Sequence, residues 1–280
     1  MARRRILWIL PAMVVLVSLS IYPILFSLKV SFTNQQGDWS LSNYSRIFAD
    51  HLLHVSIIQT ILYVTVALVI ELGLGLFFAL VIDSMGRGKY FFRAGFLAPM
   101  LLPPVVAAVI WRLIYNPEFG VLNNTLKFFG FATKNLTWTS GEGSAMASVI
   151  LVDIWEWTPF MFLLISAGLQ AIPGEPCEAA KMDGASSLRI FKDIILPLLK
   201  PTLFLAILLR AMDLLRIFDQ IWILTQGGPG LATETVSLYI YRTAFRFFNF
   251  GYAASMSLLC LILVTVFAKN LFGMMKMKVA

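Results

Sequence analysis

The sequence has little charge, few cysteines and no phosphate-binding loop. Only 13% of its 280 residues are Asp, Glu, Lys or Arg, against about 25% in an average soluble domain. Its two cysteines are too few for a structural metal site. No GxxxxGK[ST] sequence is present to hold the phosphates of a nucleotide. A soluble domain, a structural metal centre and a nucleotide-hydrolysing enzyme are therefore not expected.

Long hydrophobic runs are what the sequence has in abundance. Hydrophobic residues make up 59% of the chain, and a transmembrane helix needs about 20 of them in a row to cross about 30 Å of hydrocarbon. The sequence predicts an all-α polytopic membrane protein in which residues 1–280 form a single transmembrane domain. Its six predicted transmembrane helices cover about residues 6–28, 57–83, 95–115, 145–170, 200–225 and 251–269.

The third predicted span contains three prolines, Pro99, Pro103 and Pro104. Proline lacks a backbone N–H and crowds the preceding turn of a helix. We therefore predict that this span is kinked or locally unwound.

Lys and Arg are distributed unevenly between the connecting segments. They are more frequent in residues 3–5, 87–93, 172–199 and 269–278 than in the segments on the opposite side. Because positively charged loops stay in the cytoplasm, both termini are predicted to be cytoplasmic. The same bias accounts for most of the net charge of +7 without a nucleic-acid partner.

Several ionisable residues lie inside the predicted spans. A charge at the centre of a membrane helix costs about 2.5–3.5 kcal/mol on insertion scales, so these residues are not expected to face lipid. Glu71 has no cation within one helical turn, and we predict that it pairs with Arg210 or Arg216. The charges of the fifth span alternate every three residues and either neutralise one another or line a polar path. The candidates for that path are Glu71, Asp153, Glu156, Trp157, Arg210, Asp213, Arg216 and Asp219.

The fourth predicted span carries aromatic and acidic residues close together near its predicted outer end, from Asp153 to Trp157. Tryptophan at the end of a span is commonly an interfacial anchor. Asp153 and Glu156 are three residues apart and so share a helix face. This group is either an anchor or part of the polar path.

A charged segment interrupts the apolar pattern between the fourth and fifth spans. Pro176 can begin a helix, Glu178 lies near its positive end, and Gly184 permits a bend between two short helical pieces. The residues alone leave open an amphipathic connector on the membrane surface. The spacing of Glu178, Ala179, Ala180, Gly184, Ile194, Leu196 and Pro197 resembles the coupling motif of binding-protein-dependent ATP-binding-cassette importer permeases.

A second block resembles carbohydrate permeases of the maltose-transporter type. It comprises Phe218-Asp219, residues 223–229 and residues 251–254, and together with residues 116–123 and 168–173 it extends over nearly the whole chain. Gly227-Gly228-Pro229 reverses the chain after the fifth span. The resemblance implies that these three residues dock an external solute-binding protein.

The resemblance also implies the type I ABC importer permease fold, in a bacterial inner membrane. The chain is then a non-catalytic permease subunit whose partners are a second, non-identical permease, two ATPase subunits that bind ATP and Mg²⁺, and a solute-binding protein. The implied cargo is a sugar, or alternatively a polyol or glycerol phosphate. An ion-coupled secondary transporter would show an internal repeat, which the sequence lacks. The resemblance further implies that the coupling loop, residues 172–199, contacts the ATPases through Glu178, Ala179, Ala180, Asp183, Gly184, Leu196 and Pro197.

Overall fold

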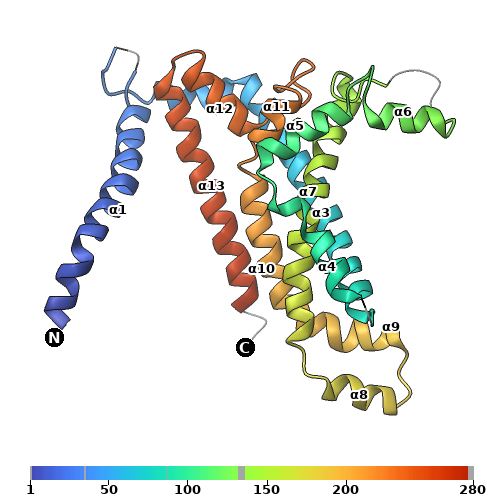
Figure 1. Ribbon diagram of the computed structural model, residues 1–280. Coiled ribbons are helices and arrows are strands. Elements are labelled where there is room, and N and C mark those ends of the chain that lie inside the picture. The colour runs from blue at the N-terminus through green and yellow to red at the C-terminus, as the bar shows by residue number, and fades with distance from the viewer. Residues whose placement is uncertain (1, 35, 87, 132–135, 277–280) are drawn as a thin grey trace. The chain divides into compact units, whose positions relative to one another are not determined.

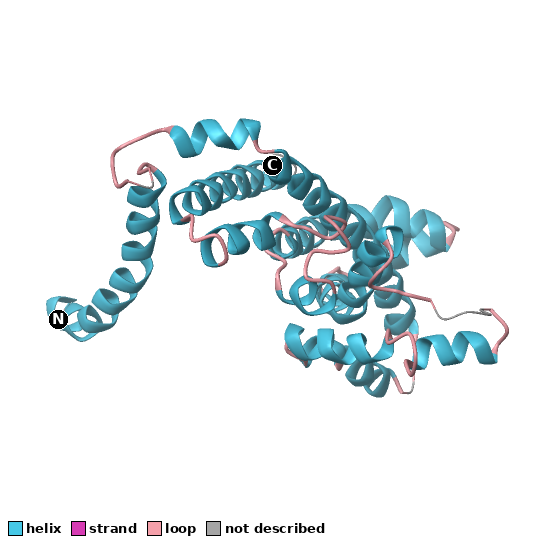
Figure 2. Ribbon diagram, turned by 90° about the horizontal axis from the view of Figure 1, so that it is seen from above, coloured by secondary structure: helices cyan, strands magenta, loops and turns pink. Residues whose placement is uncertain are grey.

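The computed structural model describes residues 2–34, 36–86, 88–131 and 136–276. These residues form helices joined by loops, with no β-strand beyond one isolated bridge (Figures 1 and 2). Five helices in this part of the chain are long and apolar enough to cross a membrane. They cover Met13–Ser31, His51–Ile82, Glu142–Gln170, Ser187–Leu214 and Phe250–Asn270.

The chain divides into two compact units. The first unit consists of Met1–His54 and Tyr239–Val266, and the second of Val55–Leu238 and Phe267–Ala280. Helices of the first unit are α1 (Ala2–Ser31), α2 (Ser42–Ala49) and most of α12 (Val236–Phe245) and α13 (Phe250–Lys276). Those of the second are most of α3 (His51–Ser84), with α4 (Lys89–Leu97), α5 (Pro104–Ile114), α6 (Val121–Phe128), α7 (Glu142–Gln170), α8 (Glu175–Met182), α9 (Ser187–Ile190), α10 (Leu196–Leu214) and α11 (Asp219–Leu224).

Asp50 joins three helices of the first unit. Its Oδ1 accepts hydrogen bonds from the backbone N–H groups of Leu52 at 2.9 Å and Leu53 at 3.2 Å, at the start of α3. Its Oδ2 accepts from the hydroxyls of Tyr239 at 2.6 Å and Tyr252 at 2.7 Å. Burial alone would raise the pKa of Asp50, but these four hydrogen bonds outweigh it and hold the pKa below its ordinary value. One carboxylate thus caps α3 and anchors α12 and α13.

Helix α1 buries almost none of its apolar surface against its own chain. No residue in the most hydrophobic 18-residue window of Met13–Ser31 is buried. Leu16, Leu19 and Tyr22 are each more than 60% exposed. Apolar surface of this extent needs lipid or another protein chain as its partner.

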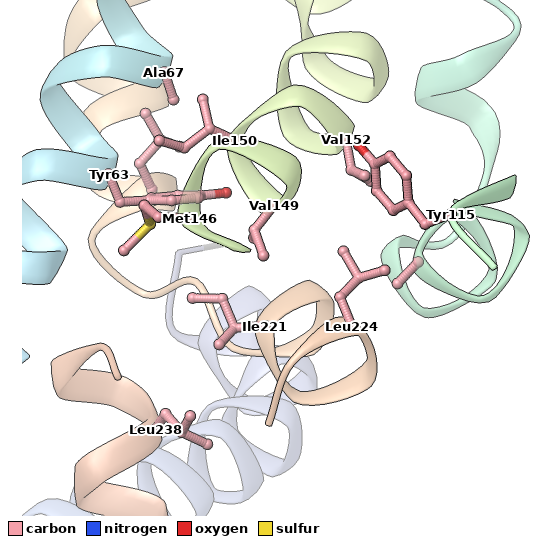
Figure 3. Close-up of a cluster of buried hydrophobic side chains, with 12 residues drawn as sticks. Tyr63, Ala67, Tyr115, Met146, Val149, Ile150, Val152, Ile221, Leu224 and Leu238 are labelled. Atoms are coloured by element: carbon pink, nitrogen blue, oxygen red, sulfur yellow. The ribbon is translucent and has the colours of Figure 1, made fainter. Parts of the chain in front are cut away.

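The core of the second unit lies where α3, α5, α7 and α11 meet. Tyr63, Val149, Leu214 and Ile221 are each fully buried there. Figure 3 shows Tyr63, Val149 and Ile221 converging from three separate helices. A second cluster, which includes Phe162, packs α3 against α7 and α10 nearby. These two clusters hold α3, α7 and α10 side by side, as Figure 1 shows.

Two glycines let these helices approach closely. A Cβ atom on Gly75 of α3 would lie 2.6 Å from Met161 Cβ on α7. A Cβ atom on Gly168 of α7 would lie 2.7 Å from two side-chain atoms of Thr202 on α10. Small residues at such positions allow backbones to come together in membranes, where packing drives helix association.

The predicted third span is divided into two helices, and its prolines are the reason. Residues 89–114 form α4, a 3₁₀ turn at Pro99–Leu101 and α5. Between the turn and α5 the backbone is extended, with ψ of 139° at Leu102 and 140° at Pro103. Pro104 then begins α5, a position where its missing N–H costs nothing. The predicted local unwinding is confirmed.

We expect Gly75→Val to destabilise the protein by about 1–3 kcal/mol, because the added side chain overlaps the α7 backbone. Gly73→Val is the matched control, since a Cβ at Gly73 on the same helix meets no atom within 4 Å. Thermal unfolding of both variants in detergent measures the difference. Equal unfolding temperatures would show that α3 and α7 do not pack at Gly75.

Candidate functional site

Four of the predicted path residues come together around Arg210. Its Nε lies 2.7 Å from Glu71 Oε2 and its Nη2 lies 3.0 Å from Glu71 Oε1, which makes a two-point contact. Its Nη2 also donates to Asp153 Oδ2, and its Nη1 lies 2.6 Å from Asp213 Oδ2. The guanidinium therefore joins α3, α7 and α10, and the predicted pairing of Glu71 with Arg210 is confirmed.

The pairs differ in their access to solvent. The Arg210 side chain is 2% exposed, and those of Glu71 and Asp153 are fully buried. Asp213 keeps 51% of its side chain exposed although it contacts the same guanidinium. A planar guanidinium with its fork of donors suits such a site better than an ammonium group. Two carboxylates thus hold Arg210 in the bundle, while Asp213 presents charge to the surroundings.

Trp157 covers the face of the same guanidinium. The Arg210 Cζ lies 5.0 Å from the centroid of the Trp157 ring, within the range of a cation–π contact. The prediction that the residues from Asp153 to Trp157 lie near the outer end of their span is wrong. They occupy the middle of α7, which begins at Glu142 and ends at Gln170. Trp157 is therefore a partner of a buried cation, and an interfacial role for it does not fit.

A second polar group lies beside the first and joins α7 to α11 and α3. Gln220 Nε2 donates to Glu156 Oε2 at 2.7 Å, and the Tyr63 hydroxyl donates to Gln220 Oε1 at 3.5 Å. All three side chains are fully buried. Asp153 Oδ1 and Glu156 Oε1 have no hydrogen-bond partner among the described residues. The region between these helices therefore holds more acceptors than donors.

Sequence reasoning missed Gln220 and Tyr63. Gln220 stands between Asp219 and the apolar run that follows it, and Tyr63 stands inside the apolar second span. An uncharged polar residue costs far less in a membrane than a charge, so hydropathy gives it little weight. For Tyr63 a signal was available, because its hydroxyl is a hydrogen-bonding group in the same predicted span as Glu71, a carboxylate with no cation within one helical turn.

Arg216 and Asp219 lie outside the cluster, and the prediction that they share a helix with Arg210 is wrong. Helix α10 ends at Leu214, and α11 begins at Asp219. Between the two helices Phe218 has φ of −140° and ψ of −55°. Both charges are exposed, and the structure shows no ion pair for either within the described residues. Asp219 instead occupies the first turn of α11, where a negative charge suits the helix dipole.

The coupling loop forms the predicted two helical pieces. Helix α8 begins at Glu175, has Pro176 in its first turn and ends at Met182. Gly184 has φ of +78°, a left-handed conformation that glycine adopts most readily. Its N–H donates to Lys181 O at 3.0 Å, and the N–H of Ala185 donates to Ala180 O at 2.9 Å. These two bonds form a Schellman motif, so Gly184 fixes the corner that ends α8.

A π-helical turn carries the coupling loop into α10. Ser186 caps α9, and the chain continues through Phe191–Ile195 as a π-helix before α10 begins at Leu196. The ring of Pro197 would crowd the carbonyl of Asp193 in a regular α-helix. A wider turn at this point relieves that crowding. The predicted pair Leu196-Pro197 therefore marks where the loop becomes a membrane helix.

The coupling loop exposes an apolar and charged surface. Met182 is 89% exposed and Leu188 is 76% exposed, while Ile190 is buried. Glu178, Ala179, Asp183 and Gly184 are exposed, and Ala180 is half-buried, so the residues predicted to contact a partner are accessible.

Gly227, Gly228 and Pro229 reverse the chain after α11, as predicted. Gly227 has φ of +86°, and the Gly228–Pro229 peptide bond is cis. Thr233 holds the loop together: its backbone N–H donates to Gly227 O at 3.1 Å and its hydroxyl donates to Gly228 O at 2.9 Å. Docking of a protein on this loop stays a prediction.

Comparison with known proteins identifies the family. Residues 71–276 match the family described as "Binding-protein-dependent transport system inner membrane component". The chain belongs to this family. As an inner membrane component with several apolar helices, it is a multi-pass membrane protein.

Relatives in this family resemble the chain over almost its full length. The trehalose/maltose transport system permease protein MalF of Thermococcus litoralis is 38% identical over 270 residues, which cover 93% of this chain and 90% of that protein. The trehalose transport system permease protein SugA of Mycobacterium tuberculosis is 33% identical over 285 residues, which cover 98% of this chain and 90% of that protein. These relatives are transport-system permeases, and the predicted membership of the permease family is confirmed.

Solved structures confirm the fold. A chain of a bacterial ABC transporter involved in the import of the acidic polysaccharide alginate superimposes with a TM-score of 0.85 and 20% identity, covering 98% of this chain and 96% of that one. A chain of a bacterial alginate ABC transporter in complex with an alginate pentasaccharide-bound periplasmic protein superimposes with a TM-score of 0.83 and 20% identity. This match covers 96% of this chain and 93% of that one. The all-α importer permease fold predicted from the sequence is thereby confirmed.

We expect Arg210→Leu to destabilise the protein by about 3–5 kcal/mol, because it leaves the Glu71 and Asp153 carboxylates buried without their cation. Arg216→Leu removes an exposed cation close by in sequence and should change stability by no more than about 0.5 kcal/mol. Thermal unfolding in detergent distinguishes the two. The ion-pair account of the cluster is incorrect if both variants unfold at the same temperature.

Proposed function

We propose that this chain is the permease subunit of an ATP-driven importer that carries a sugar delivered by an external solute-binding protein. The supporting observation is its 38% identity to a trehalose/maltose permease over 93% of the chain. The exposed coupling loop and the polar cluster between α3, α7 and α10 supply the two parts that such a subunit needs.

The coupling loop would receive the motion of two ATPase subunits, which bind ATP and Mg²⁺. Its exposed Met182 and Leu188 offer apolar contacts, and Glu178 and Asp183 offer charged ones. Because the π-helical turn at Phe191–Ile195 joins α9 to α10 without a break, displacement of α9 would move α10 and the residues at its far end. In the orientation proposed here, both termini and the coupling loop lie in the cytoplasm, as the distribution of Lys and Arg predicts.

The substrate path would run past Asp213 and Trp157. The half-exposed Asp213 carboxylate accepts hydrogen bonds from hydroxyl groups, and an indole ring offers a flat apolar face to a sugar ring. Glu71, Asp153 and Arg210 are too buried to meet solute in this conformation. They would hold Asp213 and Trp157 in position.

Two further partners follow from the same reasoning. A second, non-identical permease would cover part of the apolar surface of α1, none of whose most hydrophobic window is buried by its own chain. The solute-binding protein would dock on the loop of Gly227, Gly228 and Pro229. Gly227 is buried and Gly228 and Pro229 are half-buried, so the exposed flanking residues Gln226 and Gly230 would share the contact.

ATP hydrolysis by the complex purified from its native membrane tests this function. We expect several-fold stimulation that requires both the solute-binding protein and one sugar, such as trehalose or maltose. The reason is that the ATPase subunits of such an importer would complete their hydrolysis cycle only when the sugar-bound solute-binding protein is docked on the permease. Glycerol phosphate and a polyol in the same assay distinguish the other cargo classes. Ion-dependent uptake by the isolated chain, without ATP, would instead identify a secondary transporter.

Gly184→Leu tests the coupling loop. A non-glycine residue in the left-handed conformation costs about 1–2 kcal/mol, so the corner between α8 and α9 should change its angle. We expect transport to fall to a small fraction of the wild-type rate while the chain still folds, because a Cβ at Gly184 meets no atom within 4 Å.

Gly130→Leu is the matched control for that variant. Gly130 follows α6, has φ of +74° and likewise has no atom within 4 Å of an added Cβ. The two substitutions therefore impose the same backbone strain at different exposed corners. Equal transport by the two variants would remove Gly184 from the coupling role.

A further inference from the structure

A polar hollow in the first unit has no role in the function proposed above. It consists of two adjoining cavities of about 370 Å³ and about 440 Å³, lined by residues from the end of α1, the start of α2 and the start of α13. The side chains of Asn34, Asn43 and Asn249 line both cavities. All of the lining residues belong to the same compact unit. The hollow has the size of a site for a small molecule.

Contacts to the backbone hold each of the three amides by one end. The Oδ1 of Asn34 accepts hydrogen bonds from two backbone N–H groups of the loop that follows it, at 2.9 Å and 3.0 Å. The Oδ1 of Asn249 accepts from the backbone N–H of Tyr252 at 3.2 Å, at the start of α13. Asn43 is turned the other way, because its Nδ2 donates to two backbone carbonyls at the end of α1, at 2.9 Å and 3.0 Å.

The other end of each amide is left for a ligand. Within the described residues, the structure shows no hydrogen-bond partner for Nδ2 of Asn34, Nδ2 of Asn249 or Oδ1 of Asn43. The hollow thus offers two amide donor groups and one carbonyl acceptor. Sugar hydroxyls both donate and accept hydrogen bonds. Since the amides are already oriented, a ligand with several hydroxyl groups binds them with little further loss of side-chain freedom.

Aromatic rings lie beside these amides. Phe248 and Phe250 line the larger cavity and are 72% and 50% exposed. An aromatic ring offers a flat apolar face, and a sugar ring has an apolar face of its own, formed by its C–H groups. Polar groups that bind hydroxyls and rings that pack on a C–H face are therefore present in one hollow.

The charge of the hollow favours a neutral ligand. Arg46 is the one cation among the described residues that line it. Its Cζ lies 4.2 Å from the centroid of the Tyr252 ring, and the hydroxyl of that tyrosine donates to Asp50 Oδ2 at 2.7 Å. One cation close to one carboxylate leaves little excess charge. A phosphate or carboxylate ligand is bound best by several cationic donors, which this hollow does not offer.

We propose that this hollow binds a neutral saccharide, through the amides of Asn34, Asn43 and Asn249 and the rings of Phe248 and Phe250. The choice of a saccharide rests on the proposed function, which brings sugar to this subunit. The binding chemistry itself needs a neutral ligand with several hydroxyl groups. In the orientation proposed above, the end of α1 lies on the outer side of the membrane, where sugar is delivered. None of the lining residues belongs to the proposed substrate path.

Two variants with matched controls separate the amides from the rings. Asn34→Asp keeps the oxygen that accepts both backbone hydrogen bonds and removes the donor group that is left for a ligand. Asn116→Asp is its control, because Asn116 Oδ1 also accepts from two backbone N–H groups, at 2.9 Å and 3.2 Å, and Asn116 lines neither cavity. Phe250→Ala removes a ring. Phe247→Ala is its control, since Phe247 is 67% exposed and lines neither cavity.

Photo-cross-linking tests the site. The complex in nanodiscs, without its solute-binding protein, is exposed to trehalose or maltose that carries a diazirine, and labelled peptides are identified by mass spectrometry. We expect label in residues 30–46 and 248–251 that excess unlabelled sugar removes and that trehalose 6-phosphate leaves largely in place. Asn34→Asp and Phe250→Ala should each lower this label by about fivefold, while both controls retain it.

Several results would overturn the proposal. Absence of label from these two segments, or label that unlabelled sugar does not remove, excludes a saccharide site, and equal competition by trehalose 6-phosphate excludes a preference for neutral ligands. Equal label in Asn34→Asp and Asn116→Asp excludes the amides. If Asn34→Asp does not assemble, the comparison of Phe250→Ala with Phe247→Ala decides.

ATP hydrolysis in the same nanodiscs keeps this proposal apart from the proposed function. Stimulation by the solute-binding protein and sugar, together with absence of the label, contradicts the hollow as a site and leaves the importer function standing. Specific label without any stimulation has the opposite meaning, because the hollow then binds sugar in a protein that is not such an importer.

Discussion

The ion pairs of Arg210 constrain the helices around them, because a charge buried between membrane helices has no water to stabilise it. Glu71 on α3 and Asp153 on α7 must stay within reach of one guanidinium on α10. Three helices are thereby fixed relative to one another at a single point. The close contacts at Gly75 and Gly168 and the two apolar clusters add packing to that constraint. Any movement of α10 has to carry this cluster along or exchange its partners.

The number, length and breaks of the helices were predictable to different degrees. Hydropathy located the long spans because about 20 apolar residues in a row have few other uses. Proline chemistry predicted the unwinding before α5, although not its division into α4, a 3₁₀ turn and α5. The end of α10 at Leu214 could not be predicted, since apolar residues continue to Leu224 without a proline or glycine to mark a break. Leu214 and Ile221, which stand on either side of this break, are buried in the same cluster.

The candidate site was predictable where a charge demanded a partner. Glu71 without a nearby cation implied a pair with Arg210, and the structure contains that pair. Trp157 was harder, because sequence alone does not give the depth of a residue in its helix, and an indole suits an interface as well as a cation. Gln220 and Tyr63 were missed because an uncharged polar side chain lowers the hydropathy of a span much less than a charged one does. The position of Gln220 also depends on the break between α10 and α11, which the sequence did not reveal.

The corner at Gly184 has a mechanical consequence. A Schellman motif closes it with two backbone hydrogen bonds, and the left-handed glycine has few alternative conformations once both bonds are made. Such a corner is stiff, so α8 and α9 behave as the two arms of a bent lever. If a partner pushes on α8 as proposed, the stiff corner would pass that displacement on to α9 and α10 with little bending. The conformation of Gly184 sets the angle between α8 and α9, and the length of α8 sets how far from that corner a partner can push.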